Sequence, residues 1–166
     1  HKDLFMKIEL GSITVAEFRD GIRHLTRQPL TDEQIDAAWI AMLDDVPDYK
    51  LDLLLDLRKR YNTMLLSNTN EIHWDWSEKT CFSYKGHHAS DFFNHIYLSY
   101  RLHLLKPDAE IFEYVLQDAD IRPEETLFID DAVPNCRTAE SLGFHTYTPQ
   151  PREDWSHLFG IMNHKS

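Results

Sequence analysis

The sequence predicts an α/β protein in which a parallel sheet carries helices and a smaller helical region precedes it. Three observations support this fold class. From about residue 51 onward, short runs of β-branched and aromatic residues alternate with helical patterns, which is typical of parallel βαβ units. Before that point, two helix-start patterns occur close together. The length of 166 residues with 42% hydrophobic residues allows one sizeable core.

The amino-terminal region is expected to be helical up to Pro47. Two capping-box patterns support this expectation, Thr14 with Glu17 and Thr31 with Gln34. The second pattern opens residues 32–43, where apolar residues recur at helical spacing.

The remaining elements are expected in the order of a parallel sheet with right-handed crossovers. Helices are predicted over residues 51–61, 71–82, 108–117, 134–142 and 155–162. Strands are predicted to end at residue 67 and to span residues 95–100, 126–130 and 144–147, with a polar loop over 85–89. Gly143 is a stop signal for the helix before it.

The third of these strands ends in two adjacent carboxylates, Asp130 and Asp131. Adjacent strand residues point to opposite faces, so packing alone rarely explains two acids at the end of a buried strand. Open α/β sheets bind ligands at the carboxyl ends of their strands, and paired carboxylates suit a hard cation such as Mg²⁺. The alternative is that the pair caps the next helix.

Two further segments add groups that suit a phosphate ester. The strand-type run ending at Ser67 and Asn68 offers hydrogen-bond donors, and the next two residues, Thr69 and Asn70, are weaker candidates. Lys106 stands just before a proline and a helical pattern, where it would supply positive charge to a phosphoryl group. The alternatives are a helix-capping serine and a solvated lysine, which is the fate of most lysines.

Taken together, these motifs resemble those of the haloacid dehalogenase-like hydrolase superfamily. The segments that carry the resemblance read LSNTN, HIYLSY, KPDAEIF and FIDD, with Asn135 after them. More narrowly, they are similar to its sugar-phosphate phosphatase branch, which includes α-glucose-1-phosphate phosphatases. The resemblance implies a Rossmann-like core over residues 47–166 and a partial helical cap over residues 1–46. The chemistry it implies is Mg²⁺-dependent hydrolysis of a small phosphorylated metabolite through an aspartyl-phosphate.

The resemblance also implies roles for the candidate residues. Lys106 and Ser67 would act in catalysis, and Asn68 would join them in binding phosphate. Asp131 would be the stronger Mg²⁺ ligand, with Asp130 beside it as a ligand or a supporting group. Asn135 would orient the acidic loop, its alternative being an ordinary helix-start residue.

Members of the family open with a strand that ends in Asp-x-Asp, whose first Asp is the nucleophile. This chain begins at His1, inside the expected cap, so we expect it to lack that central strand and to be inactive alone. Its one Asp-x-Asp sequence, residues 118–120, follows a helical pattern and is interpreted as a helix end or turn. A haloacid dehalogenase needs no metal, so the acidic pair disfavours it. A non-catalytic binding protein is the alternative if the chain is complete.

Composition narrows the expected partners. The net charge of −11 disfavours nucleic acid and anionic membrane surfaces, because no basic face compensates it. No apolar stretch approaches the roughly 18 residues of a membrane-spanning helix, so a cytoplasmic protein without membrane contact is expected. Cys81 and Cys136 are expected to be free thiols. Packing is the preferred role of Trp74 and Trp76, with a substrate entrance as the alternative.

Overall fold

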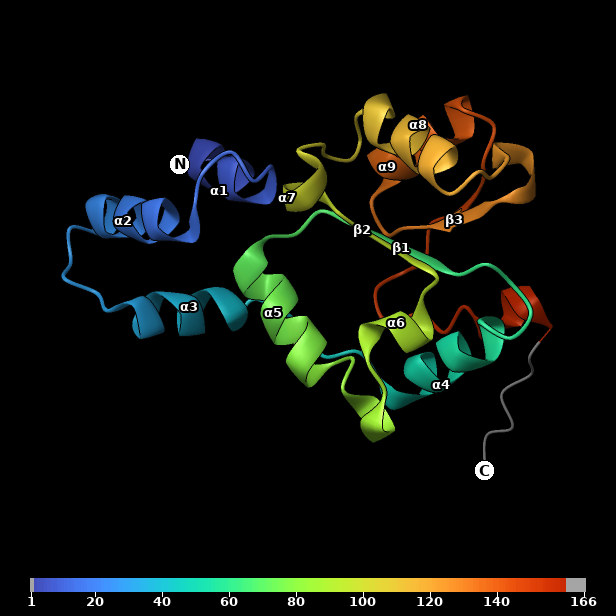
Figure 1. Cartoon of the computed structure of the whole chain (residues 1–166), viewed down its shortest axis with the longest axis horizontal. Helices are drawn as coiled ribbons and strands as arrows, with labels where there is room; N and C mark the ends of the chain where they lie inside the picture. The colour runs from blue at the N-terminus through green and yellow to red at the C-terminus, as the bar shows by residue number, and fades with distance from the viewer. Residues whose placement is uncertain (1, 161–166) are drawn as a thin grey trace. The chain divides into compact units, whose positions relative to one another are not determined.

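The computed structural model describes residues 2–160, which divide into two compact units between Leu105 and Lys106. Within these residues, β1 pairs with β2 and β3 pairs with β4, both in parallel (Figure 1). The predicted α/β class with parallel strands is therefore confirmed. The division between cap and core at residue 46 falls inside the first unit and stays a prediction.

The first unit begins with helices and continues as a βαβ arrangement. Its helices are α1 (Lys2–Glu9), α2 (Val15–Thr26), α3 (Asp32–Ile40), α4 (Asp48–Leu57), α5 (Glu71–Thr80), α6 (Ala89–Phe92) and α7 (Ser99–Leu102). Its strands are β1 (Met64–Ser67) and β2 (His95–Leu98), and a 3₁₀ turn spans Tyr84–Gly86. In the parallel register Ser67 lies opposite Leu98, so both strands end at the same edge.

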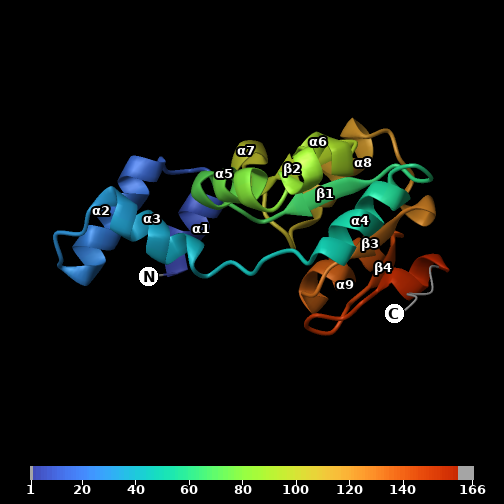
Figure 2. The ribbon, with the colours of Figure 1, turned by 90° about the horizontal axis from the view of Figure 1, so that it is seen from below.

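Both predicted capping boxes are present. The Thr14 hydroxyl accepts the Glu17 N–H, and the Glu17 carboxylate accepts the Thr14 N–H, while Thr31 and Gln34 repeat the arrangement. The helices that they open pack through buried Phe18 with apolar residues of α1, α3 and α5 (Figure 2). The sequence pattern therefore located both helix starts.

A second apolar cluster lies beneath the strand pair of the same unit. It contains Leu51, Trp74, Phe82, Ala89, Phe92, Phe93 and Leu98. Trp74 is 4% exposed and contacts Phe82, which confirms packing as its role. Trp76 is only half-buried and borders a cavity described below.

The second unit contains a smaller parallel strand pair with its own helices. Its elements are α8 (Ala109–Asp118), a 3₁₀ turn at Pro123–Glu125, β3 (Leu127–Ile129), α9 (Val133–Ser141), β4 (His145–Tyr147) and a 3₁₀ helix at Ser156–Phe159. Phe112 on α8 is fully buried, with its ring centroid 5.2 Å from that of Phe128 and 6.0 Å from that of Phe144. This aromatic cluster fixes α8 against the strand that leads to the acidic pair.

Several predicted boundaries were wrong. The helix expected from residue 51 begins at Asp48, because Pro47 takes an extended conformation and starts it earlier. The helix predicted to reach residue 43 ends at Ile40 in a turn. The strand predicted to reach residue 100 ends at Leu98, because the buried Ser99 hydroxyl bonds to neighbouring backbone and opens α7.

Two further assignments differ in part, and a third is confirmed. The expected loop over 85–89 contains a 3₁₀ turn, and α6 begins at its end. The expected closing helix over 155–162 is 3₁₀ where described, and residues 161–162 lie outside the described part of the chain. Residues 118–120 form a helix end, with Asp120 at φ 50°, so that interpretation is confirmed. In the described part of the chain, no helix is long and apolar enough to span a bilayer.

The aromatic cluster of the second unit gives a stability prediction. Phe112→Ala is expected to lower the free energy of unfolding by about 3–5 kcal/mol, since it removes a fully buried ring and leaves a cavity. Glu113 is the next residue of the same helix and is exposed. Glu113→Ala is expected to change the free energy of unfolding by less than about 0.5 kcal/mol. Urea unfolding followed by circular dichroism measures both. Equal effects would contradict the packing role of Phe112.

Candidate functional site

The second unit brings Lys106 and Asp130 together at the carboxyl end of β3. The Lys106 Nζ lies 2.6 Å from the Asp130 Oδ2, and the two side chains are 9% and 7% exposed. The same ammonium lies 5.6 Å from the centroid of the Phe128 ring, on the strand before Asp130. A charged pair this buried is tolerated only when its remaining hydrogen-bonding capacity is also satisfied.

The other acceptor positions of Asp130 are filled from the start of α9. Its Oδ1 accepts the Ala132 N–H at 2.8 Å, and the Asn135 Nδ2 lies 3.0 and 3.1 Å from Oδ1 and Oδ2. Asn135 is itself buried, one turn into the helix. Lysine, amide and backbone N–H thus surround Asp130, and all of its donors come from the second unit.

Asp131 differs from its neighbour because its side chain is exposed. Within residues 2–160, no three His, Cys, Asp or Glu side chains converge as a metal-binding group. The chemistry of the pair nevertheless fits a hard cation in one respect: Asp131 presents carboxylate oxygens at a strand end. Asp130 fits less well as a ligand, because its oxygens already accept three donors.

In the first unit, Ser67 and Asn68 lie at the carboxyl end of β1 and are half-buried. The two residues after them are fixed by hydrogen bonds. Thr69 donates its N–H to the Ser99 Oγ at 2.9 Å, and the Asn70 side chain accepts the His73 N–H and caps α5. Sequence reasoning placed Ser99 inside a strand, within the HIYLSY segment, and gave it no role in the site.

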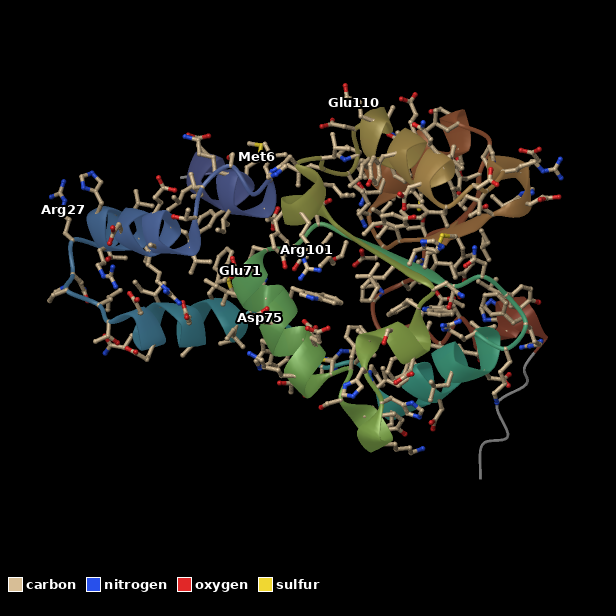
Figure 3. All side chains as sticks on the ribbon, in the orientation of Figure 1. Met6, Arg27, Glu71, Asp75, Arg101 and Glu110 are labelled. Atoms are coloured by element: carbon tan, nitrogen blue, oxygen red, sulfur yellow. The ribbon has the colours of Figure 1, made fainter. Side chains whose placement is uncertain are left out.

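A cavity of about 470 Å³ lies in the first unit, between the α2–α3 helices and α5. It is lined by Val15, Arg19, Asp36, Ile40, Glu71, Ile72, Asp75, Trp76 and Lys79. Glu71 and Asp75 on α5 lie close to Arg101 on α7 (Figure 3). Burial raises the pKa of Tyr100, and the charges of these three residues also act on it. The cavity therefore combines carboxylates, two cations and one indole ring.

His73, near the start of α5, and both cysteines contact main-chain atoms of other segments. Burial lowers the pKa of His73, whose Nε2 lies 3.0 Å from the Trp39 carbonyl oxygen. Cys81 and Cys136 are free thiols, as predicted. The Cys136 Sγ lies 3.3 Å from the Asp130 carbonyl oxygen, so it packs behind the acidic pair.

Comparison with known proteins gives a consistent result. Residues 3–143 match the haloacid dehalogenase-like hydrolase family. The chain is similar to a D-ribitol-5-phosphate phosphatase of Bacteroides thetaiotaomicron, at 38% identity over 92% of this chain and 74% of the relative. It is also similar to a sesquiterpene phosphatase of Aspergillus oryzae, at 37% identity over 58% of this chain and 47% of the relative.

Solved structures show the same likeness. A HAD family enzyme from Bacteroides thetaiotaomicron, in complex with magnesium and inorganic phosphate, superposes with a TM-score of 0.92 at 54% identity, covering 94% of this chain and 79% of that one. A predicted HAD-like family hydrolase from Porphyromonas gingivalis superposes with a TM-score of 0.89 at 36% identity, covering 95% and 77%.

The two acids of the pair are expected to contribute differently to stability. Asp130→Ala leaves the buried Lys106 charge without its partner and is expected to cost about 3–5 kcal/mol of unfolding free energy. Asp131→Ala removes an exposed side chain and is expected to change it by less than about 0.5 kcal/mol. Urea titration of both variants beside the parent tests this, and a loss as large for Asp131→Ala would contradict the assignment.

Proposed function

The chain belongs to the haloacid dehalogenase-like hydrolase family, and on that premise we propose that its function is Mg²⁺-dependent hydrolysis of small phosphate monoesters, with a phosphorylated sugar or polyol as substrate. The observation that carries the proposal is the buried Lys106–Asp130 pair beside the exposed Asp131. A fixed cation and an available carboxylate at one strand end suit a phosphoryl group and a metal. The phosphatase relatives named above support the same chemistry.

Lys106 is proposed to stabilise the negative charge on the phosphoryl group. Its ammonium carries three N–H donors, so the contact with Asp130 is compatible with donation to a phosphoryl oxygen. Asp130 then serves as the positioning group, because it holds the ammonium in one place while Asn135 and Ala132 hold Asp130. A preorganised charge needs no rearrangement during the reaction, and this is the main source of electrostatic catalysis.

Asp131 is the residue proposed to hold Mg²⁺, with Asp130 in the supporting role. When bound, the metal supplies charge neutralisation and orientation for the phosphoryl group. Ser67 and Asn68 are proposed to donate hydrogen bonds to phosphoryl oxygens from the end of β1, because their side chains are a hydroxyl and an amide. The pair of acids continues to disfavour a metal-independent dehalogenase, and the relatives with phosphatase names favour the phosphatase.

The cavity of the first unit is proposed to receive the leaving group. Two of its lining residues, Glu71 and Ile72, follow Asn70 directly in sequence. The hydroxyls of a sugar or polyol would donate to Glu71 and Asp75, and its carbon skeleton would lie on the Trp76 ring. A similar protein is a D-ribitol-5-phosphate phosphatase, which supports a polyol phosphate as a substrate class.

Magnesium titration of the enzyme that contains residues 1–166 separates the two charged roles. Asp131→Asn is expected to raise the half-saturating Mg²⁺ concentration by about tenfold or more, since it weakens a hard ligand. Lys106→Ala is expected to lower kcat by about 10²–10³-fold even at saturating Mg²⁺. Turnover that survives EDTA, or wild-type behaviour of both variants, would overturn the assignments.

A comparison of two substrates tests whether the cavity recognises the leaving group. Trp76→Ala is expected to raise KM for ribitol 5-phosphate by about tenfold, since stacking on an aromatic ring is lost, and to leave KM for p-nitrophenyl phosphate within about twofold. Trp76→Phe retains an aromatic ring and is the matched control, for which a smaller increase in KM for ribitol 5-phosphate is expected. If both KM values rose together in Trp76→Ala, the change would reflect folding rather than leaving-group recognition.

A further inference from the structure

Ser99 lies directly after β2, at the sheet edge where β1 also ends. Its strand neighbour Leu98 pairs with Ser67, so Ser99 is one position beyond the residue opposite the proposed phosphate donor. The Ser99 side chain is fully buried, with 0% exposure. A buried hydroxyl must form hydrogen bonds, because leaving one unmade is costly.

The hydrogen bonds of Ser99 join two segments that are far apart in sequence. Its Oγ accepts the Thr69 N–H at 2.9 Å. The same oxygen lies 2.7 Å from the Glu9 carbonyl oxygen and 3.0 Å from the Thr69 carbonyl oxygen. A hydroxyl has one proton, which it donates to one of these carbonyls at a time. Ser99 therefore holds Thr69 and also contacts the end of α1.

Two more contacts fix α7 against the connection between α1 and α2. The His103 Nδ1, at the carboxyl end of α7, lies 3.0 Å from the Leu10 carbonyl oxygen. Gly11 has φ +66°, and a Cβ built on it would lie 2.1 Å from the Tyr100 carbonyl oxygen. This backbone approach requires glycine. Figure 1 shows α7 beside the end of α1, in agreement with these contacts.

The other side of the same loop is held from α3. Asn70 is fully buried, and its Oδ1 lies 3.3 Å from the Trp39 Nε1, which donates to it. The same oxygen accepts the His73 N–H at 3.1 Å. Two consecutive residues after Ser67 and Asn68 are thus anchored, one through Ser99 and one through Trp39.

We infer that Ser99 is a positioning residue: its hydroxyl fixes the Ser67–Asn70 loop in the conformation that presents Ser67 and Asn68 to phosphate, and ties that loop to the α1–α2 connection. This inference rests on the proposed function, from which the ligand of the loop is taken to be inorganic phosphate or a phosphate ester. Ser99 does not touch the substrate. It acts through the backbone of Thr69, whose N–H donates to the Ser99 Oγ and whose carbonyl oxygen lies 3.0 Å from it.

The test combines an exchange measurement with inhibition by inorganic phosphate. In Ser99→Ala, the Thr69 amide is expected to exchange its hydrogen roughly tenfold faster by NMR, because its acceptor is lost. The inhibition constant of inorganic phosphate is expected to rise roughly tenfold, while half-saturation by Mg²⁺ stays unchanged. Unchanged Thr69 exchange, or an equal loss of phosphate and Mg²⁺ affinity, would overturn the inference.

Matched variants isolate the hydroxyl. Ser99→Thr and Ser99→Val add the same bulk but differ in the hydroxyl, so only Ser99→Thr is expected to retain Thr69 protection and phosphate affinity. Ser156→Ala deletes a buried serine hydroxyl in the second unit and is expected to change neither quantity. If the unsubstituted enzyme that contains residues 1–166 hydrolysed no ester, the proposed function would fail, and Thr69 exchange would still decide whether Ser99 anchors the loop.

Discussion

The buried contact between Lys106 and Asp130 is the constraint on which the second unit depends. Withdrawing two charges from water carries a large desolvation cost, which their mutual attraction offsets only with good geometry and further hydrogen bonds. Here the Asn135 amide and the Ala132 N–H supply those bonds. The start of α9 must therefore stay close to the end of β3. The aromatic cluster around Phe112 contacts the same strand through the Phe128 ring.

The first unit fixes its own loop with neutral groups. Ser99 and Asn70 are both fully buried, and their oxygens accept backbone and indole N–H groups rather than charges. Neutral hydrogen bonds carry a smaller desolvation cost than an ion pair, so they hold the loop without burying a charge beside it. The two units thus use different interactions for the same purpose, which is to hold a strand end in one conformation.

Local patterns predicted the parts of the fold that local interactions determine. Both capping boxes were found, because Thr14 and Thr31 bond within four residues of themselves. The predicted set was Ser67, Lys106, Asp130 and Asp131, with Asn135 added by the family resemblance; of these, Lys106, Asp130 and Asn135 meet in the second unit. Ser99 was missed, and its strand was drawn two residues too long, because its partners at residues 9 and 69 are distant in sequence. No local pattern reports such a contact.

The two acids directly after β3 lie in different surroundings. The Asp130 carboxylate is buried against Lys106, whereas Asp131, in the bend that follows, is exposed. A metal needs a carboxylate with available oxygens, whereas a fixed lysine needs a carboxylate whose oxygens are fully engaged. One residue cannot meet both requirements. Asp130 and Asp131 provide one carboxylate of each kind, the first with its oxygens engaged and the second exposed.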